Sequence, residues 1–220
     1  MSRTTLPAHH EKPILRGWSH ALAAVAAIAL CPIVIVTASG ARSAAAIYTS
    51  AVIGLFGVSA LYHRFGWSPR LRDFMRRLDH TMIFVMIAAT YTPIAVVALP
   101  ARSRNLVLVL TWAGAAVGAI WQWFWPDISP RLQALQYAAV GWVALLVLAD
   151  IWDAMGVAGF VLLLSGGVAH TLGAVIFAMR RPDPWPRVFG FHEIFHLLVI
   201  AAVAQHYVAV TFFAIPLARA

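Results

Sequence analysis

Histidine and acidic side chains recur at widely separated places in a chain that otherwise carries few polar residues. His192 and His196 are four residues apart, and Ser59 precedes His63 by the same interval. Residues four apart lie on one face of a helix, so two imidazoles at this spacing can bind one metal ion. Asp79 supplies a carboxylate elsewhere in the chain. Imidazoles and a carboxylate brought together are the components of a catalytic zinc site.

The predicted metal ligands are His63, His192 and His196. Three neutral imidazoles and one water complete a tetrahedral zinc site with an open position. Zinc activates such a water as a nucleophile at neutral pH. Asp79 is the carboxylate predicted to position this water, or to take its proton as a general base. The predicted cofactor is therefore Zn²⁺.

Three further titratable residues are candidate accessory groups. His80 follows Asp79, and His20 stands at the start of an apolar run, where an amphipathic interfacial role is expected. HEIFH at 192–196 also fits the zinc-protease pattern H-E-x-x-H, which would make Glu193 a general base. The motif lies in the last apolar run, so no later helix can supply a third ligand. Glu193 is otherwise expected to be a solvated carboxylate at the interface.

Composition determines which kind of scaffold must position these side chains. Of 220 residues, 62% are hydrophobic and 11% are charged, whereas soluble domains average about 25% charged residues. The chain is therefore predicted to lie in a lipid bilayer. Its net charge of +8 comes almost entirely from arginines in short gaps between apolar runs. This pattern favours anionic lipid head groups as partners and excludes nucleic acid, which needs a basic helix or patch.

The apolar runs predict an all-α, polytopic membrane protein with a bundle of seven transmembrane helices. A spanning helix needs about 20 predominantly apolar residues. Runs of that size occur near Ser19–Ser39, Ala44–His63, Thr81–Leu99, Leu106–Trp125, Leu132–Ala149, Met155–Met179 and Phe191–Phe213. The gaps are too short for an extramembrane domain. The expected organisation is a cytoplasmic tail at 1–16 and one membrane domain at 17–216.

The distribution of basic residues predicts the orientation, since Lys and Arg accumulate in cytoplasmic loops. The N-terminal segment and alternate gaps contain Arg3, Lys12, Arg16, Arg64, Arg70, Arg72, Arg76, Arg77, Arg131, Arg180, Arg181 and Arg187; the other set contains Arg42, Arg102, Arg104 and Arg219. The N-terminus is therefore predicted to be cytoplasmic and the C-terminus outside, in a bacterial-type plasma membrane. This topology places the metal-site candidates at similar depth near the cytoplasmic face. His170 and His206 would lie deeper, as packing or hydrogen-bonding residues.

Several segments together resemble the hemolysin III branch of the progestin and adipoQ receptor family. They are KPILRGWSH near the start, SALYH at Ser59–His63, RLDHTMIFVMIAATYTP at Arg77–Pro93, GGVAHTLGAVIF at Gly166–Phe177, and HEIFHLLVIAAVAQHY at His192–Tyr207. The match runs in order through nearly the whole chain. The S-x-x-x-H, L-D-H and H-x-x-x-H motifs are specific as a set, although each is weak alone.

The resemblance implies a seven-helix bundle with an inward N-terminus. It implies zinc held by His63, His192 and His196 and a water oriented by Asp79. Ser59 is then expected to contact these residues without binding the zinc itself. Relatives include lipid-sensing receptors, and the wider group includes alkaline ceramidases, which hydrolyse an amide bond. Bacterial members carry the hemolysin name because of lysis attributed to them.

Three functions are compatible with these residues. The first is a zinc-dependent intramembrane hydrolase of a lipid amide or ester, with a lipid-like substrate that enters between helices. The second is a pore-forming or lytic membrane protein, although charged residues are absent from the middle of every predicted span. The third is a membrane sensor in which structural zinc ties the second and last spans together.

Overall fold

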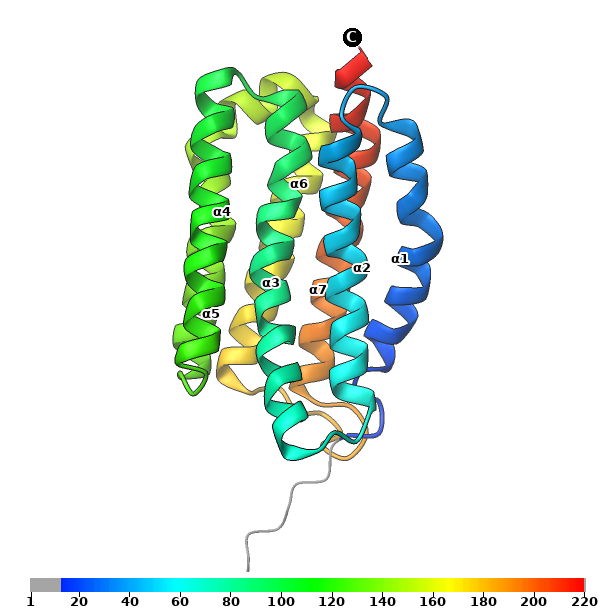
Figure 1. Ribbon diagram of the computed structural model, residues 1–220, viewed down its shortest axis with the longest axis vertical. Helices are drawn as coiled ribbons and strands as arrows, with labels where there is room; N and C mark the ends of the chain where they lie inside the picture. Colours follow the sequence, from blue (N-terminus) through cyan, green and yellow to red (C-terminus); the bar gives the residue numbers. More distant parts are fainter. Residues whose placement is uncertain (1–12, 220) are drawn as a thin grey trace, which may run out of the picture.

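The computed structural model describes residues 13–219, which form a helical bundle (Figure 1). Residues 1–12, most of the predicted cytoplasmic tail, lie outside the described part. The helices are α1 Trp18–Thr37, α2 Arg42–Arg64, α3 Pro69–Ala98, α4 Ala101–Phe124, α5 Pro130–Gly141, α6 Leu148–Met179 and α7 Phe191–Ala209. Short 3₁₀ or π segments are η1 Trp142–Val147, η2 Val210–Ala214 and η3 Ile215–Arg219.

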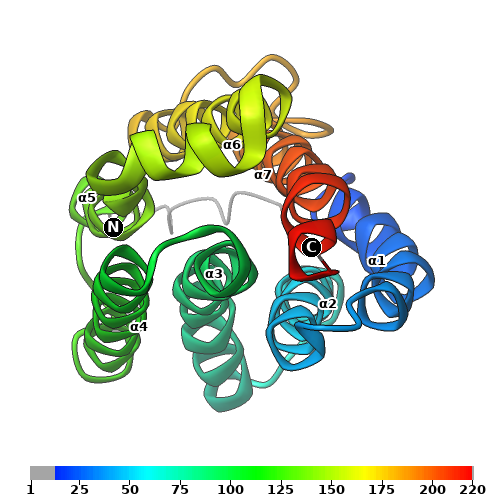
Figure 2. The ribbon, with the colours of Figure 1, turned by 90° about the horizontal axis from the view of Figure 1, so that it is seen from above.

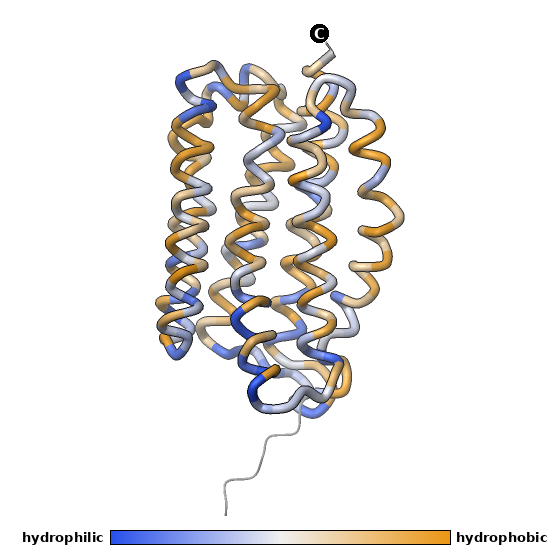
Figure 3. Tube along the Cα trace, in the orientation of Figure 1, coloured by the Kyte–Doolittle hydropathy of each residue, from blue (hydrophilic) through white to orange (hydrophobic). Residues whose placement is uncertain are grey.

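Six helical stretches of the described chain are long and apolar enough to cross a membrane. They are Trp18–Thr37, Arg42–Arg64, Pro69–Ala98, Ala101–Phe124, Pro130–Met179 and Phe191–Ala218. Hydrophobic residues follow the helices along most of their length, and hydrophilic residues gather toward the ends (Figure 3). The structure therefore confirms an α-helical, multi-pass membrane protein.

The predicted fifth and sixth runs fall within one of these stretches. Pro130–Met179 is a continuous 50-residue apolar stretch made of α5, η1 and α6, so length and composition give six candidate spans where seven were predicted. Gly156 interrupts the helical backbone with φ 65° and ψ −177°, and α6 is kinked there. A positive φ costs glycine least, so Gly156 is where the stretch can change direction without a loop.

Neighbouring helices in the chain pack side by side, and α7 returns to contact α1. Figure 2 shows the resulting ring-like arrangement from above. The end of α2, the start of α3 and the start of α7 consequently lie at the same end of the bundle (Figure 1). The helix topology thus brings together the three sequence segments that carry the predicted metal site.

Small residues allow the helices to approach closely, as is common within membranes. The buried core includes Ala45 on α2 and Ala88, Ala89 and Ala95 on α3, none of which is exposed. Gly118 on α4 is packed tightly, because a Cβ there would lie 2.3 Å from Cε1 of Phe84 on α3. The α3–α4 contact therefore depends on the missing side chain of Gly118.

We expect Gly118→Ala to destabilise the bundle by about 1–3 kcal/mol, because the added methyl overpacks against the rigid Phe84 ring. Gly57→Ala is the matched control, since a Cβ on Gly57 in α2 would meet no atom within 4 Å. Thermal unfolding of both variants in one detergent measures the difference. Equal melting temperatures for Gly118→Ala and the wild type would contradict the close α3–α4 contact.

Candidate metal centre

The three predicted ligands meet at the end of the bundle where α2 ends and α7 begins. Their ligand atoms all lie within 4.8 Å of one another. The Nε2 atoms of His63 and His192 are 3.3 Å apart, and the ring centroids of His192 and His196 are 4.5 Å apart. His63 and His196 are buried, and His192 is partly buried. The structure therefore brings His63 together with two imidazoles that lie 129 or more residues later in the chain.

The donor set fits a transition-metal ion. Two nitrogens bound to a tetrahedral zinc at about 2.0–2.1 Å would be about 3.3 Å apart, which matches the separation of the His63 and His192 Nε2 atoms. Nδ1 of His196 is buried and has no hydrogen-bond partner within residues 13–219. Buried polar atoms normally have partners. A cation with three imidazole ligands is consistent with both observations.

Asp79 on α3 lies beside the imidazole cluster. Its Oδ2 is 3.9 Å from Nε2 of His63, and the Asp79 side chain is 13% exposed. Ser59 is buried one turn before His63, and its hydroxyl can donate a hydrogen bond to the Asp79 carboxylate. Serine, aspartate and imidazole are thus adjacent, as the S-x-x-x-H and L-D-H motifs suggested.

His20 and His80 also lie at this centre. Both line the small pocket that contains Ser59, Asp79 and the α7 histidines. The expectation of an interfacial His20 was wrong, because His20 is only 3% exposed. Its ring stacks on His196 with centroids 3.8 Å apart and planes 9° apart.

His20 is buried because of how α1 begins. Gly17 precedes the helix with φ 80°, and a Cβ on Gly17 would lie 2.7 Å from Cβ of His63. This glycine therefore lets α1 start directly against the end of α2. The close approach places His20 behind His196, where it can hold that ring in position.

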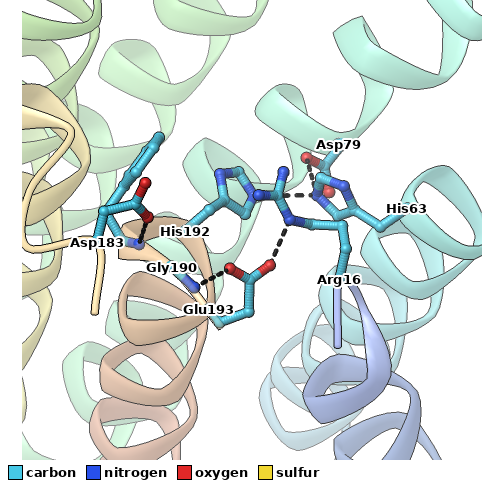
Figure 4. Close-up of polar contacts among 8 residues, drawn as sticks. Arg16, His63, Asp79, Asp183, Gly190, His192 and Glu193 are labelled. Atoms are coloured by element: carbon cyan, nitrogen blue, oxygen red, sulfur yellow. Dashed lines mark hydrogen bonds and ion pairs between the residues drawn. The ribbon is translucent and has the colours of Figure 1, made fainter. Parts of the chain in front are cut away.

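Glu193 has a different role from either of those considered in the sequence. It is not solvated, because only 2% of the residue is exposed. Its Oε1 pairs with Nε of Arg16, and its Oε2 accepts a hydrogen bond of 2.8 Å from the Gly190 N–H. Figure 4 shows these contacts beside His63 and His192. Because both carboxylate oxygens are occupied, Glu193 fixes the start of α7 and is poorly placed to act as a protease base.

The sequence interpretation missed Arg16 as a partner. Arg16 lies in the segment before α1, whose backbone also pairs with the α6–α7 connection: the Ile14 N–H donates to the Arg187 carbonyl at 3.0 Å. In the sequence Arg16 contributed only to the predicted orientation and to the resemblance carried by KPILRGWSH. An ion pair between residues 177 positions apart has no signature in a single sequence.

An apolar cavity of about 140 Å³ lies inside the bundle next to the metal centre. It shares the lining residues Leu55, Ile83, Tyr137, Phe195 and Val199 with the small pocket around the histidines. Its walls come from α2, α3, α5, α6 and α7 and are largely hydrophobic. The centre therefore adjoins an apolar space, with the shared side chains forming a common wall.

His170 and His206 lie along this cavity rather than at the metal centre. Nε2 of His206 is 3.2 Å from the Leu163 carbonyl oxygen, as expected for a hydrogen-bonding residue. His170 faces His206, with ring centroids 5.5 Å apart. Neither belongs to the group of three histidines that could hold a metal.

Comparisons with known proteins agree with the motif set. The family model described as Haemolysin-III related matches residues 8–207. Hemolysin-3 of Bacillus cereus is 28% identical over 213 residues, covering 94% of each chain. Heptahelical transmembrane protein ADIPOR2 of Oryza sativa subsp. japonica is 34% identical over 151 residues, covering 61% of this chain and 65% of the rice protein. Human monocyte to macrophage differentiation factor is 26% identical over 171 residues, covering 74% and 67%.

We expect His63→Ala, His192→Ala and His196→Ala each to lose bound metal. Replacing even a group that only supports a ligand lowers metal affinity about 10–100-fold, so removing a ligand should do at least as much. Elemental analysis of protein purified without chelators measures the metal content. His170→Ala is the matched control and should keep its metal. Metal content unchanged in all three ligand variants would contradict the centre.

Proposed function

The chain belongs to the Haemolysin-III related family, and from this membership and the site geometry we propose that it is a zinc-dependent intramembrane hydrolase of a lipid amide or ester. The observation that carries the proposal is the meeting of three imidazoles and the Asp79 carboxylate beside an apolar cavity. In the proposal His63, His192 and His196 hold the metal. Zinc at such a site provides polarisation of a carbonyl and activation of a water.

Asp79 is the proposed general base. Its Oδ2 lies 3.9 Å from Nε2 of His63, and Asp79 lines the small pocket together with His192 and His196. A carboxylate there can orient a water by accepting its hydrogen bond and then take the proton during attack on the carbonyl. Ser59 would hold the carboxylate in place by donating a hydrogen bond to it.

The cavity supports a lipid as substrate. Its lining is mainly aliphatic and aromatic, so the chain of a membrane lipid would exchange one apolar environment for another on entering it. Phe195 and Val199 line both this cavity and the histidine pocket. A chain lying along them would present its polar linkage to Asp79 and the imidazoles.

We place the site at the cytoplasmic face of a seven-span domain at 17–216, with the C-terminus outside. The excess of Lys and Arg in alternate loops supports an inward N-terminus. The kink at Gly156 supports division of Pro130–Met179 into two passes. The rice relatives are themselves named heptahelical.

A sensor with structural metal is the second candidate, and the same contacts favour it. The three ligands connect α2 with α7, so a metal would couple movements of these helices whether or not it is catalytic. A lytic function is suggested only by the name of the Bacillus cereus relative. These alternatives differ from the hydrolase in what they require of Asp79.

We expect Asp79→Asn to retain metal and to lower lipid hydrolysis by about 10²–10⁴-fold, the usual effect of losing a general base. Asp73→Asn, an exposed aspartate on the same helix, is the matched control. The measurement is release of fatty acid from a panel of lipid amides and esters by purified, zinc-loaded protein.

Wild-type protein that hydrolyses no member of the panel would contradict the enzyme. If Asp79→Asn also left ligand responses unchanged, the structural-metal sensor would be favoured. Leakage from liposomes that survives His63→Ala would favour the lytic function.

The topology predicts which introduced cysteines react with a membrane-impermeant maleimide applied to intact cells. In a Cys31→Ser background we expect Asp153→Cys to be labelled, and Ser68→Cys and Arg181→Cys to be protected. Asp153 precedes the kink, and the other two lie in arginine-rich connections. Labelling of Arg181→Cys with protection of Asp153→Cys would contradict the two-pass arrangement.

A further inference from the structure

Two histidines that are not candidate metal ligands line the apolar cavity. His170 on α6 and His206 on α7 both line it side by side, with ring centroids 5.5 Å apart. A Cβ on Gly166 would lie 2.4 Å from Nε2 of His206, so this glycine makes room for the ring between α6 and α7. Imidazoles within an otherwise apolar cavity are costly unless they are hydrogen-bonded.

The other polar groups near this pair already have partners in the protein. The Tyr91 hydroxyl donates to the Gly141 carbonyl at 2.5 Å and accepts from the Ala144 N–H at 2.9 Å. The Trp142 Nε1–H donates to Oγ1 of Thr171 at 3.0 Å. His170 differs, since its ring nitrogens make no hydrogen bond to any residue of the described chain.

The contact of His206 with Leu163 determines which ring nitrogens of the two histidines can donate and which can accept a hydrogen bond. The Leu163 carbonyl can only accept, so Nε2 of His206, 3.2 Å from it, carries the proton. In the neutral ring Nδ1 of His206 is then an acceptor. His170 offers one N–H donor and one acceptor. A ligand group that both donates and accepts, as a hydroxyl does, satisfies an acceptor on one ring and a donor on the other.

We propose that His170 and His206 bind a hydroxyl group on the hydrocarbon part of the lipid that occupies this cavity. The inference rests on the proposed function and specifies its substrate class: a lipid hydroxylated far from the bond that is cut. An unsubstituted chain would leave His170 buried against methylenes without a partner, a state disfavoured relative to the hydroxylated one.

The position of the pair indicates where the hydroxyl should be. His206 is ten residues after His196 on one helical stretch, or about 15 Å along the axis, a distance that an extended chain of about twelve carbon atoms spans. A hydroxyl near carbon 12 of an acyl chain would therefore reach the pair when the head of the lipid lies at the metal centre.

The test compares the affinities of stearic, 2-hydroxystearic and 12-hydroxystearic acids for zinc-loaded Asp79→Asn protein, by displacement of a fluorescent fatty acid. We expect 12-hydroxystearic acid to bind about tenfold more tightly than stearic acid, from two hydrogen bonds formed in an apolar cavity. The 2-hydroxy isomer should show no such gain, because its hydroxyl lies at the other end of the cavity.

The variants assign the preference to the histidines. His170→Phe keeps an aromatic ring of similar volume, and the affinities for 12-hydroxystearic and stearic acid should become about equal. His170→Gln retains a donor and an acceptor and should keep most of the preference for the 12-hydroxy acid. Thr90→Val is the matched control, since the Thr90 hydroxyl also lines the cavity but already donates to the Met86 carbonyl at 2.8 Å. The preference should survive that change.

Equal binding of the three acids by the protein, a preference that persists in His170→Phe, or no binding of any of them would overturn the inference. These outcomes are separate from failure of the proposed function. A protein that prefers the 12-hydroxy acid but hydrolyses no lipid would keep the hydroxyl site and lose the hydrolase. A protein that hydrolyses amides without this preference would keep the hydrolase and lose the hydroxyl site.

Discussion

The site depends on the contact between the end of α2 and the start of α7, where Nε2 of His63 and Nε2 of His192 come within 3.3 Å. Two polar rings would not remain so close in an apolar bundle without support. Glu193 supplies it by pairing with Arg16 and accepting the Gly190 N–H. The segment before α1, the α6–α7 connection and the first turn of α7 are thereby held as one unit around the imidazoles.

Several buried polar groups of the helices are satisfied within their own helix, whereas ring nitrogens at the candidate site are not. Threonines within the helices donate to carbonyls four residues earlier, as Thr49, Thr90, Thr92 and Thr111 do, so they cost little in an apolar environment. The ring nitrogens of His20 and Nδ1 of His196 are buried without partners in the described chain. A bundle this apolar tolerates such groups chiefly where they serve function, and these three nitrogens lie together beside the candidate ligands.

Much of the fold and site could be predicted because the signals were local. Apolar runs of spanning length are read directly from the chain, and the i, i+4 spacing of His192 and His196 fixes a shared face. Matching depths at the helix ends then placed His63 and Asp79 nearby. The Arg16–Glu193 pair and the stacking of His20 on His196 depend on how α1 packs against α7, and no local pattern encodes that contact. The continuity of the predicted fifth and sixth runs was likewise not predictable, because a single glycine, Gly156, kinks the stretch with no polar loop between the two runs.

The depth of the centre is itself a chemical requirement. Hydrolysis needs water, a proton acceptor and a polar linkage, none of which is stable at the middle of a bilayer about 30 Å thick. His192 and His196 lie in the first two turns of α7, and the lining of the cavity includes Val199 and His206 further along the same helix. In the proposed function a lipid would keep its polar linkage at the interface and its chain in an apolar space, so neither part would have to leave the environment that it already prefers. For the proposed hydrolase this arrangement would remove the desolvation cost of a centrally placed site, and it would account for the clustering of the candidate ligands at helix ends.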